Sequence, residues 1–195
     1  MPVMARPKEF DRETVLKQAI AVFADHGYEG TSTGALLCAM GISRQSLYDT
    51  FGDKRRLYLD ALRHYITESV ADQIRILNGT ASPLKGIEAA LYALAERASA
   101  DGASGCLGVG AIWEFGRSDP EITTLSEAVG ATLRSALERR IAEAKAVGEI
   151  GADIEVHAAA QFIQTTLAGL RFAARGGASP ATLRDICRMA LRSLN

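Results

Sequence analysis

The chain is poor in the residues that build disulfide-rich, metal-binding and membrane proteins. Its 195 residues include only three cysteines, which are Cys38, Cys106 and Cys187, and these are too far apart for a disulfide framework or a spaced metal site. No apolar run is long enough to span a membrane, and no signal peptide is evident. We therefore expect a protein of the reducing cytoplasm with no metal site and no membrane partner.

Catalytic and cofactor-binding patterns are also missing. The three histidines, His26, His64 and His157, have no spaced partners for metal binding or general-base work. No nucleophile–base pattern and no phosphate loop occurs, and Gly108-x-Gly110 follows no strand, which argues against a dinucleotide site. The sequence predicts no enzyme and no cofactor.

The chain has no excess of charge of either sign. Its net charge is −1, and Lys/Arg and Asp/Glu also balance within residues 1–60. A chain that binds nucleic acid with this composition must do so through local placement of a few side chains.

The pattern of helix starts and stops predicts an all-α protein of about nine helices. The chain is rich in alanine and has only five prolines, which favours helix. N-cap residues, first-turn prolines and glycine stops divide the sequence at regular points, with Asp153 expected to cap the eighth helix. We expect helices near residues 11–27, 32–41, 43–51, 54–77, 83–101, 107–115, 120–148, 153–176 and 180–194. Residues 1–55 are predicted to form a helix-turn-helix DNA-binding domain, and residues 56–195 a larger helical effector-binding and dimerisation domain.

The segment 32–51 is typical of two short helices around one tight turn. Ser32 or Thr31 can cap the first helix, and Gly41 can end it in the left-handed conformation. Ser43 is a good cap for the second helix, whose Leu47 and Phe51 lie one turn apart. This leaves the polar residues near the start of the second helix exposed.

Those polar residues have the chemistry of DNA contacts. Arg44 can bond two acceptors of guanine and Gln45 can pair with adenine, while the hydroxyls of Ser46 and Tyr48 suit phosphate oxygens. The alternative is an ordinary solvated amphipathic helix.

Three cations follow at the start of the next helix. Lys54, Arg55 and Arg56 come directly after Asp53, in a first turn where cations oppose the helix dipole. A bound phosphate would reverse this effect, since helix N-termini bind anions. The cluster therefore suggests a DNA backbone, and the alternative is a solvated charge run.

Three spaced motifs in this region resemble tetracycline-repressor (TetR) family regulators. They are Phe23-Ala-Asp-His-Gly27-Tyr28-Glu-Gly-Thr31-Ser32, Met40-Gly41-Ile42-Ser43 and Leu47-Tyr48-Asp-Thr-Phe51-Gly-Asp-Lys54. Further along, Gly105-Cys106-Leu107 with Asp119-Pro120-Glu121 resembles one branch of that family. The resemblance implies a dimeric, all-helical regulator that binds double-stranded operator DNA, usually a repressor released by a small ligand.

The resemblance also implies roles for individual residues. Ser32 and Thr33 would contact phosphate, Arg44, Gln45 and Ser46 would face bases or nearby phosphates, and Tyr48 and Lys54 would hold the backbone. Ser43 belongs to the same candidate set. Leu36-Leu37-Cys38 departs from the family pattern, which affects packing more than DNA binding.

The last two helices have apolar faces broader than one stripe. Ala158, Ala159, Phe162, Ile163, Thr166, Leu167, Leu170 and Ala174 cover much of the eighth helix. A helix that is apolar most of the way round is buried or packs on a partner. We expect a homodimer through these two helices, with burial inside one chain as the alternative.

An effector is expected to bind among the middle helices. Tyr65, Tyr92, Trp113, Glu114 and Phe115 are the candidate pocket residues, although core packing or solvent exposure would explain each one singly. Cys106 would lie at a helix N-terminus, where the dipole favours the thiolate, so it is a candidate redox or electrophile sensor. A small buried thiol is the plainer interpretation.

These patterns favour a ligand-responsive, dimeric DNA-binding transcriptional regulator. We expect a repressor that leaves a palindromic operator when a small effector moves the helix of residues 54–77 and changes the spacing of the two reading helices. The alternatives are a redox or electrophile sensor acting through Cys106, and a helical ligand-binding protein without DNA binding.

Overall fold

The computed structural model describes residues 10–101 and 105–194, and this part of the chain contains nine helices and no strand. The all-α prediction and the helix number are therefore confirmed. The helices are α1 (Arg12–His26), α2 (Thr33–Met40), α3 (Arg44–Phe51), α4 (Lys54–Leu77), α5 (Pro83–Asp101), α6 (Leu107–Phe115), α7 (Pro120–Ala146), α8 (Val156–Arg175) and α9 (Pro180–Arg192). No helix among these residues is long and apolar enough to cross a membrane.

Side-chain caps begin most of these helices, as the sequence indicates. Asp11, Ser32, Ser43, Asp53 and Ser179 each accept a hydrogen bond from a backbone N–H of the first turn. Asp119 does the same for α7, and these N–H bonds, followed by the charge of Arg55, hold the pKa of its carboxyl below the ordinary value. The caps satisfy N–H groups that a helix leaves without partners.

The start of α8 differs from the start that the sequence predicts. Asp153 does not cap this helix, because the helix begins at Val156 and its N-cap is Glu155, two residues after Asp153. The carboxylate of Glu155 accepts hydrogen bonds from the N–H groups of His157 and Ala158. Asp153 lies instead in the turn that leads into the helix.

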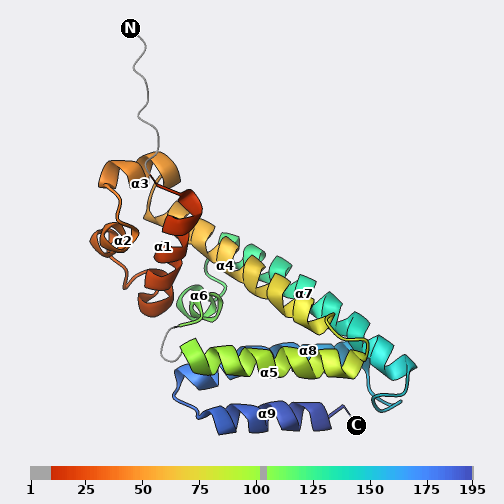
Figure 1. Ribbon diagram of the computed structural model, residues 1–195. Coiled ribbons are helices and arrows are strands. Elements are labelled where there is room, and N and C mark those ends of the chain that lie inside the picture. The colour runs from red at the N-terminus through yellow and green to blue at the C-terminus, as the bar shows by residue number, and fades with distance from the viewer. Residues whose placement is uncertain (1–9, 102–104, 195) are drawn as a thin grey trace.

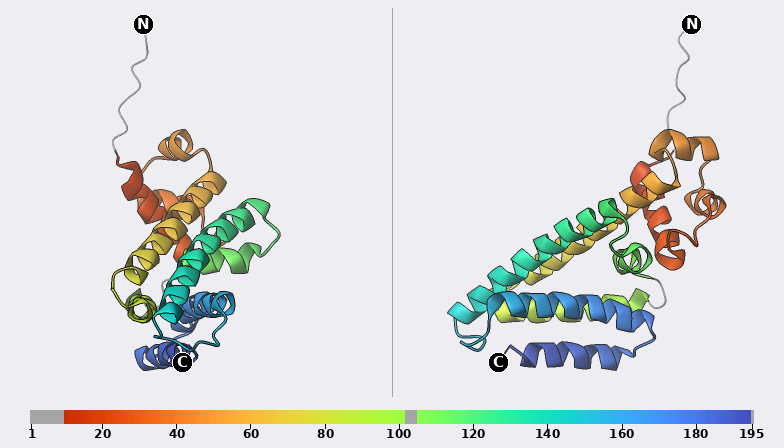
Figure 2. Two further views of the ribbon diagram at one scale, coloured as in Figure 1. Left: turned by 90° about the vertical axis from the view of Figure 1, so that its right-hand side faces the viewer. Right: turned by 180° about the vertical axis from the view of Figure 1, so that it is seen from behind.

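Two groups of helices lie at opposite ends of the molecule. In Figure 1, α1, α2 and α3 cluster at one end, and α4 runs from them beside α7. Helices α5, α8 and α9 pack together at the other end (Figure 2). The short α6 lies at the junction, where it contacts α1, α4, α7 and α8.

The hydrophobic core has two parts, and the N-terminal part extends beyond the first three helices. It combines buried residues of α1–α3 with Leu57, Ala61 and Leu62 of α4, and with Leu107 of α6 and Ile122 of α7. The second part joins the end of α4 to α5, α7, α8 and α9. The domain division between residues 55 and 56 stays a prediction, and it falls within the first turn of α4.

Tyr58 of α4 is at the centre of the N-terminal core. Its ring lies 5.0 Å from that of Phe23, 5.1 Å from that of Tyr28 and 5.6 Å from that of Phe115, measured between centroids. Edge-to-face and tilted pairs at these distances are favourable. The cluster thus fixes α1, α4 and α6 against one another.

The hydroxyl of Tyr58 is buried and has no hydrogen-bond partner among the described residues. Burial raises the pKa of this hydroxyl above its ordinary value. We expect Tyr58→Phe to leave the free energy of unfolding unchanged or to increase it by up to about 1 kcal/mol, because an unpaired buried O–H is removed. Tyr58→Ala should lower it by about 3–5 kcal/mol, because the rings lose their packing.

Urea unfolding of both variants at one fixed protein concentration measures the two effects. A loss above about 1 kcal/mol in Tyr58→Phe would mean that the hydroxyl has a partner in solution.

Candidate nucleic-acid interface and effector pocket

Helices α2 and α3 form a helix-turn-helix unit whose turn is set by local chemistry. The hydroxyl of Ser32 accepts a hydrogen bond from the N–H of Ala35 at 3.1 Å, which begins α2. Gly41 ends α2 with φ 62° and ψ 27°, a left-handed conformation that glycine adopts at little cost. Ser43 then caps α3 by accepting from the N–H of Ser46 at 3.1 Å.

The buried side of α3 leaves its polar side open. Leu47 and Phe51 are buried against the N-terminal core, whereas Arg44 and Gln45 are exposed. Tyr48 keeps 45% of its surface exposed, which is high for a tyrosine in a folded domain. These three side chains are free to meet a groove, and they lie along the first turns of α3 as the sequence predicts.

The remaining candidate DNA contacts lie at the same helix starts. Thr33 is the first residue of α2 and is half-buried. The hydroxyls of Ser43 and Ser46 are 2.9 Å apart and bond each other. The side-chain amide of Gln45 donates to Asp49 at 2.8 Å, one turn along α3. The role of each residue in DNA contact stays a prediction.

The basic cluster at the start of α4 is divided between two tasks. Lys54 lies with its ammonium 4.2 Å from the centre of the Tyr28 ring, a cation–π distance, and Arg56 is exposed. Arg55 instead forms an ion pair with Asp119 at the start of α7, at 2.5 Å. Arg55 therefore joins α4 to α7, and the contact of this basic cluster with a DNA backbone stays a prediction.

The C-terminal end of α1 is held by two side chains that are distant in sequence, one on α6 and one on α8. The carboxylate of Glu114 on α6 accepts from the N–H of Tyr28 at 2.8 Å and from the N–H of Glu29 at 2.6 Å. Arg175 at the end of α8 donates to the carbonyl of Ala24 at 3.2 Å. We call these three bonds the α1-end contacts.

The α1-end contacts satisfy one of the last carbonyls of α1 and two N–H groups of the turn that follows the helix. The last carbonyls of a helix have no partner within it, and a cation there is favoured by the helix dipole. Gly27 makes the approach possible, since it adopts φ 72° and a Cβ there would lie 3.0 Å from the Glu114 carboxylate. Gly105 leaves the space that the Arg175 guanidinium occupies beside Ala24.

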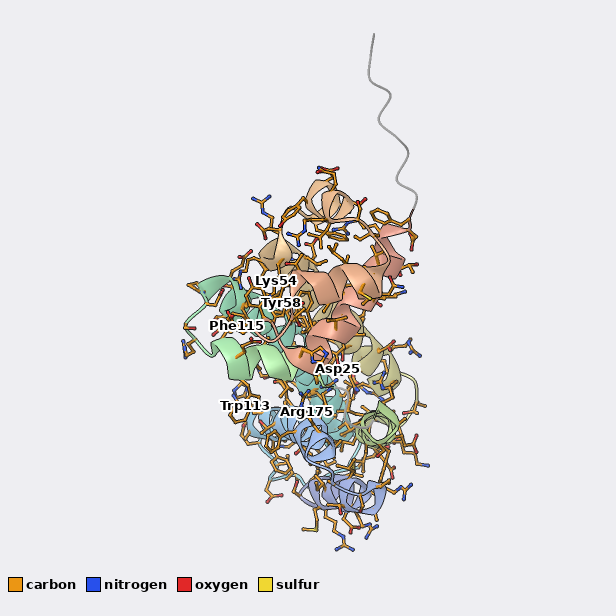
Figure 3. The ribbon with its side chains drawn as sticks, turned by 90° about the vertical axis from the view of Figure 1, so that its left-hand side faces the viewer. Asp25, Lys54, Tyr58, Trp113, Phe115 and Arg175 are labelled. Atoms are coloured by element: carbon orange, nitrogen blue, oxygen red, sulfur yellow. The ribbon has the colours of Figure 1, made fainter. Side chains whose placement is uncertain are left out.

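Two cavities open on either side of this junction. The larger has a volume of about 590 Å³ and is lined by residues of α1, α4, α5 and α8. The smaller, of about 360 Å³, is lined by Phe23, Ala24, Gly27, Tyr58, Cys106, Leu107, Val109, Gly110, Trp113, Glu114, Arg171, Phe172 and Arg175. Cys106, Arg171 and Arg175 belong to both linings. Figure 3 shows Trp113 and Arg175 close together where α6 meets the end of α8.

The structure brings together some of the predicted pocket residues and separates others. Tyr65 lines the larger cavity, while Trp113 and Glu114 line the smaller one. Phe115 belongs to the aromatic cluster around Tyr58, and Tyr92 packs against the C-terminal core. Neither Phe115 nor Tyr92 is part of the two linings.

Sequence reasoning missed the two arginines and Phe172. Arg171 and Arg175 are one helical turn apart on α8, in a stretch that is otherwise apolar. Their spacing could have marked them as a pair on one face of the helix. Their position beside α6, however, depends on packing that no local pattern shows.

Cys106 is the N-cap residue of α6 and is half-buried, and its side chain makes no capping hydrogen bond. Cys106 lines both cavities. Its reactivity stays a prediction. Within the described residues, no group of three or more His, Cys, Asp and Glu side chains could hold a metal ion.

Helix α8 has one buried face and one exposed apolar face. Ala159, Ile163, Leu167 and Leu170 are buried within the chain. Ala158, Phe162, Gly169 and Phe172 are exposed on the other face, with Phe162 at 46% and Phe172 at 57%, and Thr166 is half-buried. Both interpretations of the broad apolar surface therefore apply, since one face packs internally and the other remains open to a partner.

The α1-end contacts lead to a stability prediction. We expect Glu114→Gln to lower the free energy of unfolding by about 1 kcal/mol, because an amide NH₂ group must face one of the two N–H donors. Chemical unfolding monitored by circular dichroism measures this, with Glu127→Gln on the exposed side of α7 as the matched control. Equal stability of the two variants would show that the Glu114 bonds contribute nothing.

Comparison with known proteins places the whole chain in one family. Residues 15–61 match the family described as bacterial regulatory proteins, tetR family, and residues 83–190 match the tetracyclin repressor-like C-terminal domain. The HTH-type transcriptional regulator YezE of Bacillus subtilis is 35% identical over 98% of this chain and 100% of its own length. The HTH-type transcriptional repressor ComR of Escherichia coli is 29% identical over 96% of this chain and 90% of its own.

Solved structures agree with this placement. The TetR family transcriptional regulator CifR, solved as a cysteine mutant with a 26-bp double-strand operator DNA, has a TM-score of 0.84 and 31% identity to this chain. The match covers 97% of this chain and 100% of that one. The extent of these matches and the helix-turn-helix geometry lead to one conclusion: the chain belongs to the TetR family of bacterial transcriptional regulators.

Proposed function

We propose that this regulator is a homodimeric repressor that binds a palindromic operator and leaves it when a small molecule binds near α6. The observation that carries the proposal is that side chains lining the smaller cavity also form hydrogen bonds with the backbone of the DNA-reading domain. Glu114 and Arg175 line the smaller cavity and also hold the end of α1. A molecule in this cavity therefore touches the groups that position α1.

We assign the DNA contacts to the exposed side of α2, α3 and the start of α4. Arg44 and Gln45 would read base edges in the major groove, and Ser46 would read a base or hold a nearby phosphate. Phosphate contacts would come from Ser32, Thr33, Ser43, Tyr48 and Lys54. The exposure of Arg44, Gln45 and Tyr48 supports this assignment.

We assign dimerisation to the exposed apolar face of α8 together with α9. Two copies of these helices would form a four-helix bundle that buries Phe162 and the exposed Met189 of α9. A two-fold dimer presents two copies of α3 to successive major grooves, about 34–36 Å apart in the simplest geometry. This arrangement explains why the operator would be palindromic.

Release follows from a difference in effector affinity between two states. An effector shifts the equilibrium only if it binds the DNA-free state more tightly than the DNA-bound state. The α1-end contacts and the Arg55–Asp119 ion pair connect α1 and α4 to α6, α7 and α8. A shift of α6 would therefore be transmitted to α1 and to the start of α4.

The DNA assignment is tested by two substitutions with different expected results. Arg44→Ala should weaken operator binding by about 1–3 kcal/mol and relax the preference at one base position, because a base contact is lost. Lys54→Ala should weaken binding to all sequences similarly and reduce the slope of log affinity against log salt by about 1, because a phosphate contact is lost.

Fluorescence anisotropy with labelled duplexes, selected by the protein from a random pool, measures both effects at several salt concentrations. Arg63→Gln on the exposed side of α4 is the control, and it should bind as the unsubstituted protein does. An Arg44→Ala protein that keeps full affinity and full sequence preference would contradict the assigned readout.

A further inference from the structure

The smaller cavity combines an apolar wall with two arginines that have no carboxylate partner among the side chains that the structure describes. Phe23, Leu107, Val109 and Phe172 contribute apolar surface to the lining. Among the described residues, Arg171 donates to the hydroxyl of Ser69 at 2.9 Å and Arg175 donates to the carbonyl of Ala24 at 3.2 Å. Both acceptors are neutral, and neither guanidinium forms an ion pair with the side chains that the structure describes, which are those of residues 10–100 and 105–194.

Glu114, the single carboxylate in this lining, is already engaged. Its two oxygens accept from the N–H groups of Tyr28 and Glu29. Two arginines against one occupied carboxylate leave the lining with a net positive charge. Arg171 is half-buried and Arg175 is exposed at the rim, and arginine binds carboxylates through two parallel hydrogen bonds.

The larger cavity shares Arg171 and Arg175 but adds three carboxylates, those of Glu13, Glu68 and Asp72. Lys17 pairs with Glu13, and Arg97 pairs with Asp72, at 2.7 and 3.2 Å. Glu68 is an exposed carboxylate of the same lining. An anion on Arg171 and Arg175 therefore meets fewer carboxylates on the side of the smaller cavity than on the side of the larger one.

The shape and the polar atoms of the smaller cavity fit a compact aromatic acid. Trp113 and Phe172 stack with their ring centroids 6.0 Å apart and an angle of 25° between the planes, and they form one wall. Tyr58 contributes a buried hydroxyl that has no partner among the described residues. A volume of about 360 Å³ is within the usual range for small-molecule sites.

We propose that the smaller cavity binds an apolar monoanion, most simply an aromatic carboxylate, whose charged group lies on Arg171 and Arg175 and whose ring lies beside Trp113 and Phe172. Binding itself is independent of DNA. The claim that such a molecule is the effector rests on the proposed repressor function. When the molecule binds, Arg175 would exchange the Ala24 carbonyl for the ligand carboxylate. This exchange would remove one of the α1-end contacts.

The test uses 4-bromobenzoate and its neutral counterpart 4-bromobenzamide on the full-length protein. Trp113 is the single tryptophan of the chain, and bromine quenches tryptophan fluorescence, so quenching reports occupancy beside this residue. We expect the carboxylate to bind about tenfold more tightly than the amide or better, since a charge-assisted hydrogen bond is stronger than a neutral one. Equal affinities, or no quenching by the carboxylate at millimolar concentration, would overturn the proposal.

Substitutions locate the charge that makes the difference. We expect Arg175→Gln and Arg171→Gln each to reduce the preference for the carboxylate, and Arg175→Lys to retain part of it. Arg63→Gln, on the exposed side of α4 and outside both linings, should keep the full preference. A double Arg171→Gln, Arg175→Gln protein that is folded by circular dichroism and still prefers the carboxylate would place the anion elsewhere and overturn the assignment.

A second measurement separates this site from the repressor function. Operator binding is measured by anisotropy with and without 4-bromobenzoate. Carboxylate binding without any operator binding would contradict the proposed function and leave the anion site standing. Operator binding with no preference for the carboxylate would contradict the anion site and leave the proposed function standing. Weaker operator binding with the carboxylate, and not with the amide, is the result expected if both hold.

Discussion

The arrangement of the DNA-reading domain depends on how the C-terminal end of α1 is satisfied. A helix end leaves backbone groups without partners, and here those partners come from α6 and α8 rather than from nearby residues. Glu114 brings a carboxylate to a helix C-terminus, where the dipole opposes a negative charge, so it is held by its two N–H bonds. Arg175 supplies the opposite charge at the same end. Two charged side chains on different helices therefore fix one end of α1, and a change in either helix reaches it directly.

Other contacts at the junction also join α1 and α4 to α6 and α7. Tyr58 packs against Phe23, Tyr28 and Phe115, which makes α1, α4 and α6 parts of one core. Arg55 joins the start of α4 to the start of α7. The cavities lie beside these contacts rather than at a distance, since Tyr58, Glu114 and Arg175 are all part of one lining. In a TetR family regulator, this geometry lets the occupant of the cavity and the position of the reading helices share the same few residues.

Local signals in the sequence were sufficient for the helices but not for the site. Caps such as Ser43 and stops such as Gly41 act over a few residues, so the nine helices and the reading unit could be predicted. The start of α8 was misplaced because Asp153 and Glu155 are both able to cap, and only the path of the chain decides between them. The partners of Arg55 and Arg175 lie far away in sequence, on helices whose packing sets the distances. Tyr92 and Phe115 show the same limit, since an aromatic residue of a core cannot be told from one of a pocket without that packing.

The distance between the two reading domains of the dimer tests the role of the α1-end contacts most directly. A spin label on the exposed Cys38 of α2 reports this distance by pulsed electron paramagnetic resonance. The labelled protein carries Cys106→Ser, and the buried Cys187 remains unlabelled. We expect a narrow distribution for this protein with and without operator. Glu114→Gln together with Arg175→Gln should give a broad distribution without operator, because the end of α1 is no longer fixed. Identical narrow distributions for the two proteins would contradict the conclusion that these contacts position the DNA-reading domain.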